Sequence, residues 1–394
     1  MHLSQRVSGL SGSVTLALAA TARRMADSGR DVVNMAVGEP DFSAPRRARE
    51  AAKAAIDSGL VKYTPAAGLA SLRSEIAATL RRERSIEFEP ENVVVCHSAK
   101  HALSHALLAL VDPGDDVLLP VPVWGSYDEQ VRIAGGQPVH VPPLEGRACA
   151  PDLEAIRAAI GPRTRGIMVN SPSNPSGYVW TEDEIRGLCE ICLERDLWLI
   201  SDEIYARLVF DDARHVSPAA HSHEMRDRTI VVDGASKVFA MTGYRIGFLA
   251  AANPLARKVA DLQSQVSGCP NYVSQRAYEA CLAEDPEEVA EMIATFDRRR
   301  RIVVDGLAAI GCKGPEPRGA FYAFPDLGDH FDERGCDGFC ADLLEEEALA
   351  VVPGSTFGAS RHVRLSYALA EDRVEEALTR LERFLGTRSG PSRP

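Results

Sequence analysis

The sequence lacks the cysteine pattern of a disulfide-bonded protein. Nine cysteines, an odd number, are scattered over 394 residues, whereas small secreted domains carry paired cysteines at regular spacings. Cys189 and Cys192 have the spacing of a redox or zinc motif, but they fall in a helical stretch, and no second pair lies at zinc-site spacing. Cys336 and Cys340 are one helical turn apart, with no histidine shortly after them. We therefore predict small apolar cysteines, no metal site, and a reducing, cytoplasmic location.

Long apolar runs and a basic excess are also missing. No run approaches the length that spans a membrane, and the short apolar run 14–20 is interrupted upstream and does not favour a signal peptide. The formal net charge is −12, which argues against nucleic-acid binding because that needs a concentrated basic face. The one basic run, 298–301, lies within a helical pattern and predicts a solvated or salt-bridged helix face. We expect neither a nucleic acid nor a membrane as partner.

From about residue 90, short apolar runs alternate with amphipathic helical stretches. Apolar strands without alternation, separated by such helices, predict an α/β fold in which a mostly parallel sheet is covered on both faces. Seven strands are expected, at 93–96, 117–120, 137–141, 166–170, 197–201, 229–233 and 246–251. Helices are expected between them, at 100–110, 127–134, 151–160 and 181–195.

The chain is longer than one hydrophobic core usually organises, so two domains are expected. After about residue 285 a long helical stretch is followed by short strands and two more helices, which is typical of a small α+β domain. We predict a large ligand-binding domain at 46–285 and a small domain at 286–387. The N-terminal segment 1–45 is expected to pack against the small domain, and the tail 388–394 to be disordered.

Polar residues follow several of the predicted strands. In parallel sheets ligands bind beyond the carboxyl ends of the strands, and polar side chains gather there at Ser98, Asn174, Asp202, Ser236 and Lys237. Because these ends meet at one edge of the sheet, four loops are expected to bring complementary chemistry to one place.

One part of this edge suits a phosphate. A phosphate needs backbone N–H donors at a helix N-terminus, a hydroxyl and a cation. Ser98, Ala99 and Lys100 lie between a strand and a helix, and Ser236 and Arg245 supply a hydroxyl and a charge.

The remaining residues suit a substituted aromatic ring. Trp124 offers a flat stacking partner, and Asp202, at the end of a buried strand, could keep a ring nitrogen protonated. Tyr205 and Asn174 could donate to a phenolic oxygen, and the amine of Lys237 could form an imine with an aldehyde. Each residue alone has an ordinary structural explanation, such as a helix cap or a core position. Together with the phosphate site they describe pyridoxal 5′-phosphate (PLP).

Eight motifs extend this pattern over nearly the whole chain. They are GEPDF (38–42), KYTPAAGLASLR (62–73), DPGDDVLLP (112–120), NSPSNPSG (170–177), SDEIY (201–205), SK with TGYRIGF (236–248), GAFY (319–322) and VRLSYA (363–368). With them the sequence resembles the class I/II aminotransferases, PLP-dependent enzymes of fold type I, and is most similar in pattern to the bacterial aspartate-aminotransferase-like group.

The resemblance implies a role for each matching residue. Lys237 would form the imine with PLP and move a proton, with Asp202 pairing with the ring nitrogen and Tyr205 with the ring oxygen. Arg364 would clamp the substrate α-carboxylate, helped by Asn174 and the backbone at Gly38, beside the Trp124 ring. Tyr63 would reach the phosphate of a neighbouring subunit, which implies a homodimer with shared active sites.

Some positions depart from the family pattern. The phosphate loop reads HSAK, without the usual glycines, and His97 and His101 flank it as either local hydrogen-bonding or substrate-facing groups. Cys269 lies in the unusual segment SGCPN, and its meaning is open. Leu108 falls where related aspartate enzymes carry a polar or basic residue, which argues against specificity for aspartate and glutamate. Further candidate pocket residues are Thr15, His97, Tyr322 and those near Ser267.

We predict an aminotransferase that moves the amino group of an α-amino acid to a 2-oxo acid. The same residues would also support a PLP-dependent lyase, replacement enzyme or oxidase, because those reactions share the first proton transfer. A transcription regulator with an aminotransferase-like domain is not favoured, since GEPDF begins at Gly38 and leaves no room for a DNA-binding extension.

Overall fold

A seven-stranded sheet forms the centre of the molecule in the computed structural model, which describes residues 3–10, 12, 14–147, 149–284 and 286–388. Its order is β2-β8-β7-β6-β5-β3-β4, and all neighbours are parallel except β8, which is antiparallel to β2 and β7. This confirms the predicted α/β fold with a mostly parallel sheet. The strands are β2 (Val93–Cys96), β3 (Asp116–Pro120), β4 (Gln137–Val141), β5 (Thr164–Asn170), β6 (Trp198–Asp202), β7 (Thr229–Gly234) and β8 (Gly247–Ala250).

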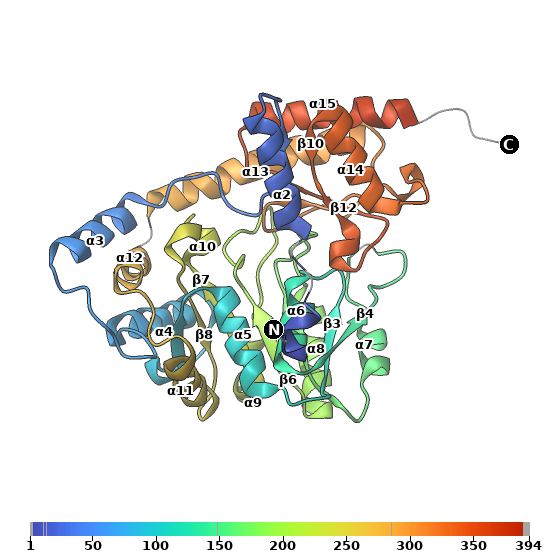
Figure 1. Cartoon of the computed structure of the whole chain (residues 1–394). Helices are drawn as coiled ribbons and strands as arrows, with labels where there is room; N and C mark the ends of the chain where they lie inside the picture. The colour runs from blue at the N-terminus through green and yellow to red at the C-terminus, as the bar shows by residue number, and fades with distance from the viewer. Residues whose placement is uncertain (1–2, 11, 13, 148, 285, 389–394) are drawn as a thin grey trace.

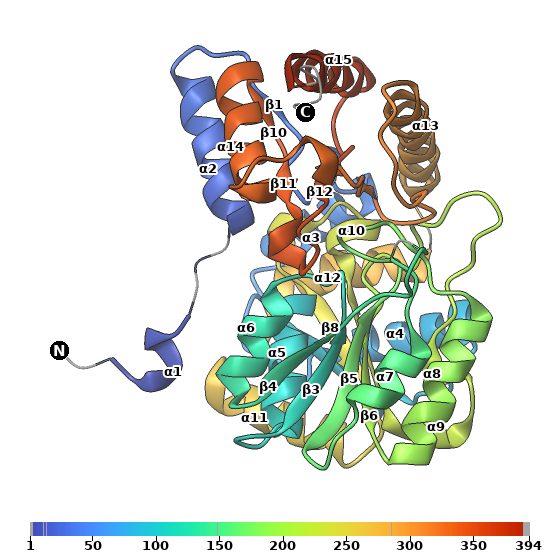
Figure 2. The same ribbon diagram turned by 90° about the vertical axis from the view of Figure 1, so that its right-hand side faces the viewer.

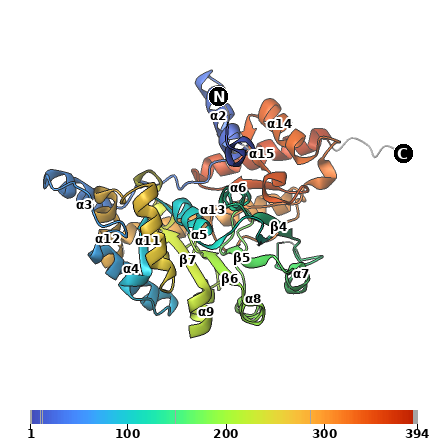
Figure 3. The same cartoon turned by 60° about the horizontal axis from the view of Figure 1, so that its bottom comes forward.

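Helices cover both faces of this sheet (Figures 2 and 3). Val94 of β2 packs in one apolar cluster with α5 (Ala99–Leu110), whereas its neighbours Val93 and Val95 pack in another with α4 (Ala70–Arg84) and α12 (Tyr272–Ala283). Successive strand residues point to opposite faces, so a strand covered twice must be apolar throughout. The expected continuous apolar runs follow from this double burial. The other covering helices are α6 (Ser126–Ala134), α7 (Leu153–Ala159), α8 (Glu182–Arg195), α9 (His223–Arg228) and α11 (Leu255–Val266).

The C-terminal part forms a second, smaller layer above the sheet (Figure 1). A three-stranded antiparallel sheet has the order β11-β12-β9 and packs with three helices. The predicted boundaries at residues 45 and 285 stay predictions; Asp285 and the tail residues 389–394 lie outside the described residues. The elements are α13 (Glu287–Ala309), β9 (Tyr322–Ala323), α14 (Gly335–Glu347), β10 (Leu349–Ala350), β11 (Val352–Pro353), β12 (Val363–Ser366) and α15 (Glu371–Arg388).

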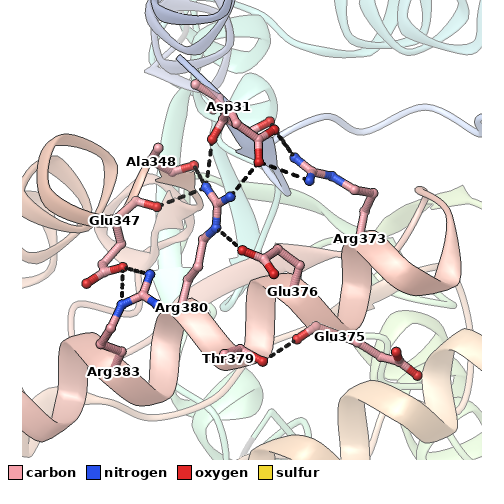
Figure 4. Close-up of polar contacts among 10 residues, drawn as sticks. Asp31, Glu347, Ala348, Arg373, Glu375, Glu376, Thr379, Arg380 and Arg383 are labelled. Atoms are coloured by element: carbon pink, nitrogen blue, oxygen red, sulfur yellow. Dashed lines mark hydrogen bonds and ion pairs between the residues drawn. The ribbon is translucent and has the colours of Figure 1, made fainter.

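The N-terminal segment lies against this C-terminal layer. Strand β1 (Val33–Asn34) pairs in parallel with β10, and α2 (Val14–Asp27) lies beside α14 and shares an apolar cluster with it (Figure 2). Two arginines of α15 hold the turn before β1: Arg373 and Arg380 each donate to the Asp31 carboxylate at 2.7 Å (Figure 4). Arg380 also donates to the carbonyl of Ala348 at 3.2 Å, so one side chain joins three segments.

The basic run 298–301 is ion-paired along α13. Arg299 donates to both oxygens of Asp41, at 2.7 and 2.9 Å, and Arg300 lies 2.8 Å from both Asp211 and Asp297. Both arginines are buried. The run therefore packs the two layers together, in agreement with the salt-bridged helix face that the sequence predicted. None of the helices in the described ranges is long and apolar enough to cross a membrane.

A second buried ion-pair cluster lies behind the central sheet. Arg84, the last residue of α4, donates to Glu203 at 2.7 Å and to Asp233, and His215 lies 3.0 Å from Glu203. Burial by itself would raise the pKa of Glu203, but His215 and Arg84 outweigh burial and lower it to about 2. Glu203 and Asp233 sit at the ends of β6 and β7, so the cluster fixes the strand ends that carry Asp202 and Lys237.

Replacing Arg84 by methionine should destabilise the protein by about 3–5 kcal/mol, because two buried carboxylates would lose their common partner. Urea unfolding measures this change. Arg82→Met on the same helix is the control, since Arg82 is exposed and contacts Glu83 and Thr79 on its own helix; this change should alter stability by less than about 0.5 kcal/mol. Equal unfolding midpoints for the two variants would contradict the importance of the cluster.

Candidate active site

A cavity of about 480 Å³ lies at the carboxyl ends of β5, β6 and β7. Its wall includes every residue named from the sequence as catalytic, cofactor-binding or substrate-binding, except Tyr63. These residues are Gly38, Ser98, Ala99, Lys100, Trp124, Asn174, Asp202, Tyr205, Ser236, Lys237, Arg245 and Arg364.

Asp202 ends β6 with its carboxylate buried in this cavity wall. Its Oδ2 accepts a hydrogen bond from the Tyr127 hydroxyl at 2.6 Å, and its Oδ1 accepts one from the Ile204 amide at 3.2 Å. No Lys, Arg or His in the described ranges lies within ion-pair distance of it. Burial raises the pKa of Asp202 to about 7, although the Tyr127 and Ile204 hydrogen bonds act in the opposite direction. A cationic ligand group would stabilise the ionised form.

Lys237 follows β7 in the short helix α10 (Ala235–Val238). Its Nζ donates to the carbonyl of Gly38 at 2.5 Å, which joins the central sheet to the N-terminal segment. Burial lowers the pKa of Lys237 to about 8; Glu39 opposes this shift, whereas Arg364 and Arg245 reinforce it. The lowered pKa leaves more of the amine unprotonated near neutral pH than in an ordinary lysine, which favours a role as nucleophile or base.

The expected phosphate loop adopts its conformation without glycine. Ser98 caps α5, where its hydroxyl accepts from the His101 amide at 3.2 Å, and its φ of 176° is ordinary extended backbone. The loop can lie close to β8 because Gly247 of that strand has no side chain. A Cβ at Gly247 would lie 2.4 Å from the amide nitrogen of Ala99. The packing of this loop against β8 therefore requires a residue without a side chain at Gly247.

Arg364 is a buried cation without a carboxylate partner in the described ranges. One guanidinium nitrogen donates to Asn174 Oδ1 at 2.9 Å and another to the carbonyl of Ala36 at 2.7 Å, while its Nε has no partner. The charge lies 4.6 Å from the Tyr322 ring centre, and burial lowers the pKa of Arg364. Such a group favours an anionic ligand.

Two tyrosines close this end of the cavity. The hydroxyls of Tyr205 and Tyr322 are 2.8 Å apart, and both side chains are buried. The Tyr322 hydroxyl would lie 3.0 Å from a Cβ built at Gly38, so only a small residue fits there. Tyr322 was expected to line the pocket, and the structure confirms that placement.

Trp124 and Lys100 lie on the open side of the cavity. The Lys100 ammonium is 4.3 Å from the Trp124 ring centre and 3.3 Å from the Ser126 hydroxyl. Thr15 of α2 also lines the wall, as expected from the sequence.

A second, wider cavity of about 1030 Å³ adjoins the first and shares Lys100 and Trp124 with it. His97, His101 and Ser267 line this second cavity, and the two imidazole rings lie 5.2 Å apart at a steep angle. Leu108 lies half-exposed on α5 and lines neither cavity. The expectation that the enzyme is not specific for aspartate and glutamate, which rested on Leu108, stays a prediction.

Tyr63 is the one predicted site residue that the structure places elsewhere. It is 98% exposed, in the segment between α3 (Arg46–Asp57) and α4. Leu60 and Val61 beside it are also exposed. Cys269 lies at the base of the same segment, where its sulfur accepts from the Thr64 amide at 3.3 Å.

Several residues of the cavity wall were not recognised from the sequence, among them Tyr127, Asn170 and Glu39. Tyr127 bonds Asp202; Asn170 ends β5 and donates to the Asp202 carbonyl at 2.9 Å; and Glu39 accepts from Thr242 at 2.9 Å. Asn170 and Glu39 lie within motifs already singled out. Tyr127 offered a weaker signal, its spacing of three residues from Trp124.

Comparison with known proteins agrees with this geometry. An aspartate aminotransferase of Geobacillus stearothermophilus is 41% identical over 99% of this chain and 100% of its own length. A probable aspartate/prephenate aminotransferase of Aquifex aeolicus is 41% identical over 97% and 98%. The solved structure of the Thermus thermophilus aspartate aminotransferase with maleate superposes with a TM-score of 0.93, at 38% identity over 98% of this chain and 100% of that one.

The family described as aminotransferase class I and II matches residues 30–381. This match and the near full-length similarity above cover both the central sheet and the C-terminal layer. The chain therefore belongs to the class I and II aminotransferase family, with its fold-type-I architecture.

Proposed function

We propose that this aminotransferase uses PLP to move the amino group of an acidic α-amino acid to a 2-oxo acid. The observation that carries the proposal is the position of Lys237 in one cavity with Asp202 and Arg364. A buried amine with a lowered pKa lies there with a carboxyl group and an arginine, and neither of these two has an ion-pair partner in the described part of the chain.

The residues present fit the cofactor. Backbone amides at the start of α5 and the side chains of Ser236 and Arg245 would hold the phosphate, and Trp124 would cover the ring. Asp202 would pair with the ring nitrogen, which accounts for its having no ion-pair partner among the described residues. Tyr205 and Asn174 would donate to the ring oxygen. When bound, PLP supplies an aldehyde and an electron sink for the bond being broken at the substrate Cα.

The chain's own residues would then orient the substrate and move the proton. Arg364 would bind the α-carboxylate with two parallel hydrogen bonds, and its contact with Asn174 fixes the plane of the guanidinium. Lys237 would accept the proton from the substrate Cα at its Nζ and return it on the other side of the reacting bond system. Its lowered pKa of about 8 suits both steps near neutral pH.

The choice of an acidic substrate rests on the cations of the cavity. Arg364 and Arg245 would be occupied by the α-carboxylate and the phosphate, which leaves Lys100 and Arg23 on the wall. An acidic side chain is the complement of that remaining charge. The relatives named aspartate aminotransferases, and the Thermus enzyme solved with the dicarboxylate maleate, support the same choice over elimination, replacement or oxidation.

We also propose a homodimer with shared active sites. Ile56, Leu60, Val61 and Tyr63 expose large apolar side chains on one segment, and contiguous exposed apolar surface marks protein contacts. A second copy of the chain would cover this segment and receive Tyr63 at the open side of its own cavity.

The lysine assignment can be tested by chemical trapping. Borohydride treatment of the PLP-loaded protein should fix the cofactor on the peptide that contains Lys237, as seen by mass spectrometry, and abolish activity. Lys237→Ala should give no labelled peptide and no visible cofactor absorbance band from a lysine adduct. Lys258→Ala, an exposed lysine paired with Asp261 on α11, should behave as wild type. Labelling at another lysine would overturn the assignment.

The substrate assignment can be tested with Lys100→Met, which keeps the backbone amide and removes the charge. The value of kcat/KM for aspartate should fall about 10–100-fold, since hydrogen bonds to charged groups contribute about 1.5–3 kcal/mol. The value for alanine should change less than about threefold, and PLP should still bind. An equal decrease in kcat/KM for both amino acids would show that Lys100 does not contact the substrate side chain.

A further inference from the structure

The first turn of α6 approaches the candidate active site through residues spaced three apart. Trp124, just before the helix, lines the cavity beside the expected ring position. Tyr127 donates to Asp202 at 2.6 Å. Gln130 donates to the carbonyl of Lys100 at 2.9 Å, at the start of α5. One helical face thus contacts the ring wall, the buried carboxylate and the phosphate loop.

We propose that Tyr127 is a positioning residue that fixes the Asp202 carboxylate and favours its ionised form. The proposal deepens the proposed function, since it concerns the group expected to pair with the ring nitrogen of PLP. Tyr127 would act through Asp202 and does not itself touch the reacting atoms.

The Tyr127 side chain is held in one position by its surroundings. Its side chain is 1% exposed, and its amide donates to the Trp124 carbonyl at 2.9 Å, which closes the turn. The Trp124 and Tyr127 rings meet edge to face with centres 5.5 Å apart. Gly125 between them packs against the C-terminal layer, because a Cβ there would lie 2.5 Å from the carbonyl oxygen of Thr356. The hydroxyl is therefore held on Asp202 by packing from three sides.

The donors to Asp202 come from two different elements. The Ile204 amide follows β6 and holds Oδ1, whereas the Tyr127 hydroxyl comes from α6 and holds Oδ2. The carboxylate plane is fixed only when both are present. The backbone donor would survive any side-chain substitution, so the orientation of Asp202 depends on Tyr127.

The charges around Asp202 make this hydrogen bond important for ionisation. Burial, Asp233 and Glu203 favour the neutral acid, and Tyr127 and the Ile204 amide favour the carboxylate. Lys237, across the cavity, also favours the carboxylate, and Tyr205 is the remaining titratable neighbour. Burial and Asp202 raise the pKa of Tyr127 itself well above its ordinary value, so Tyr127 remains a neutral donor over the range in which Asp202 ionises.

The sign of the pH effect follows from the raised pKa of Asp202. The folded, unloaded chain holds the proton up to about pH 7, whereas an unfolded aspartate releases it near 3.8. Asp202 therefore makes the unloaded protein less stable as pH rises from about 4 to about 7. Removing the Tyr127 hydroxyl should raise the pKa of Asp202 further and therefore increase the loss of folding stability at high pH.

The test is a double-substitution cycle with Tyr127→Phe and Asp202→Asn, measured by urea unfolding of the full chain without PLP at pH 5 and pH 8.5. Both pH values use one protein concentration. With Asp202 intact, and for a rise of one unit in the pKa of Asp202, Tyr127→Phe should shift the unfolding equilibrium about tenfold more at pH 8.5 than at pH 5. Combined with Asp202→Asn, its effect should be the same at both pH values. An equal effect in both backgrounds at both pH values would reduce Tyr127 to a packing residue and overturn the proposal.

A buried tyrosine outside the cavity provides the matched control. Tyr367 is fully buried, and its hydroxyl makes a long hydrogen bond of 3.4 Å to the Ala320 carbonyl. Tyr367→Phe removes the same atom and should show no pH-dependent difference between the background with Asp202 intact and the Asp202→Asn background.

PLP titration separates this proposal from the proposed function. Tyr127→Phe should bind PLP several-fold more weakly than wild type, followed by tryptophan fluorescence, whereas Tyr367→Phe should bind equally well. If wild type itself bound no PLP, the proposed cofactor would fail, yet the unfolding cycle would still decide whether Tyr127 controls Asp202. Unchanged PLP affinity in Tyr127→Phe would contradict a positioning role toward the cofactor.

Discussion

The candidate active site depends on two buried ionisable side chains, a carboxyl group and a guanidinium group. Asp202 and Arg364 lie in one cavity, and neither has an ion-pair partner among the described residues. A buried ionised group without a partner costs several kcal/mol. The surrounding fold holds both side chains in place with neutral hydrogen-bonding groups. Tyr127 and the Ile204 amide do so for Asp202, as Asn174 and the Ala36 carbonyl do for Arg364.

Buried charges outside the cavity, in contrast, form ion pairs with one another. Arg299 meets Asp41 with two hydrogen bonds where the layers join, and Arg84 bridges Glu203 and Asp233 behind the sheet. In these pairs each charged group is neutralised by a group of the protein, so none needs a ligand of opposite charge. They also anchor the strand ends and the N-terminal segment that carry Lys237 and Gly38. The contrast between paired and unpaired buried charges separates supporting residues from ligand-binding ones.

The sequence allowed much of the sheet and its edge to be predicted, because double burial makes a strand continuously apolar and the functional side chains follow directly. Asp202 and Lys237 were found in that way. The reversed direction of β8 leaves no mark on apolar composition. Tyr127 was missed because a helix position reveals its contact only once α6 is packed on β6. The position of Leu108 outside both cavities was not predictable for a related reason, since a place on a helix does not fix which side chain faces the cavity.

Asp202 and Glu203 show how completely surroundings decide the behaviour of a carboxylate. They are adjacent in the chain and both buried, yet the pKa is about 7 for one and about 2 for the other. At the strand end Asp202 contributes to the cavity wall, where burial dominates. Glu203 lies in the cluster behind the sheet, where Arg84 and His215 outweigh burial. Consecutive residues of a strand end point to opposite faces, so one of two adjacent acidic residues, Asp202, lines the cavity, whereas the other, Glu203, secures the strand end from behind the sheet.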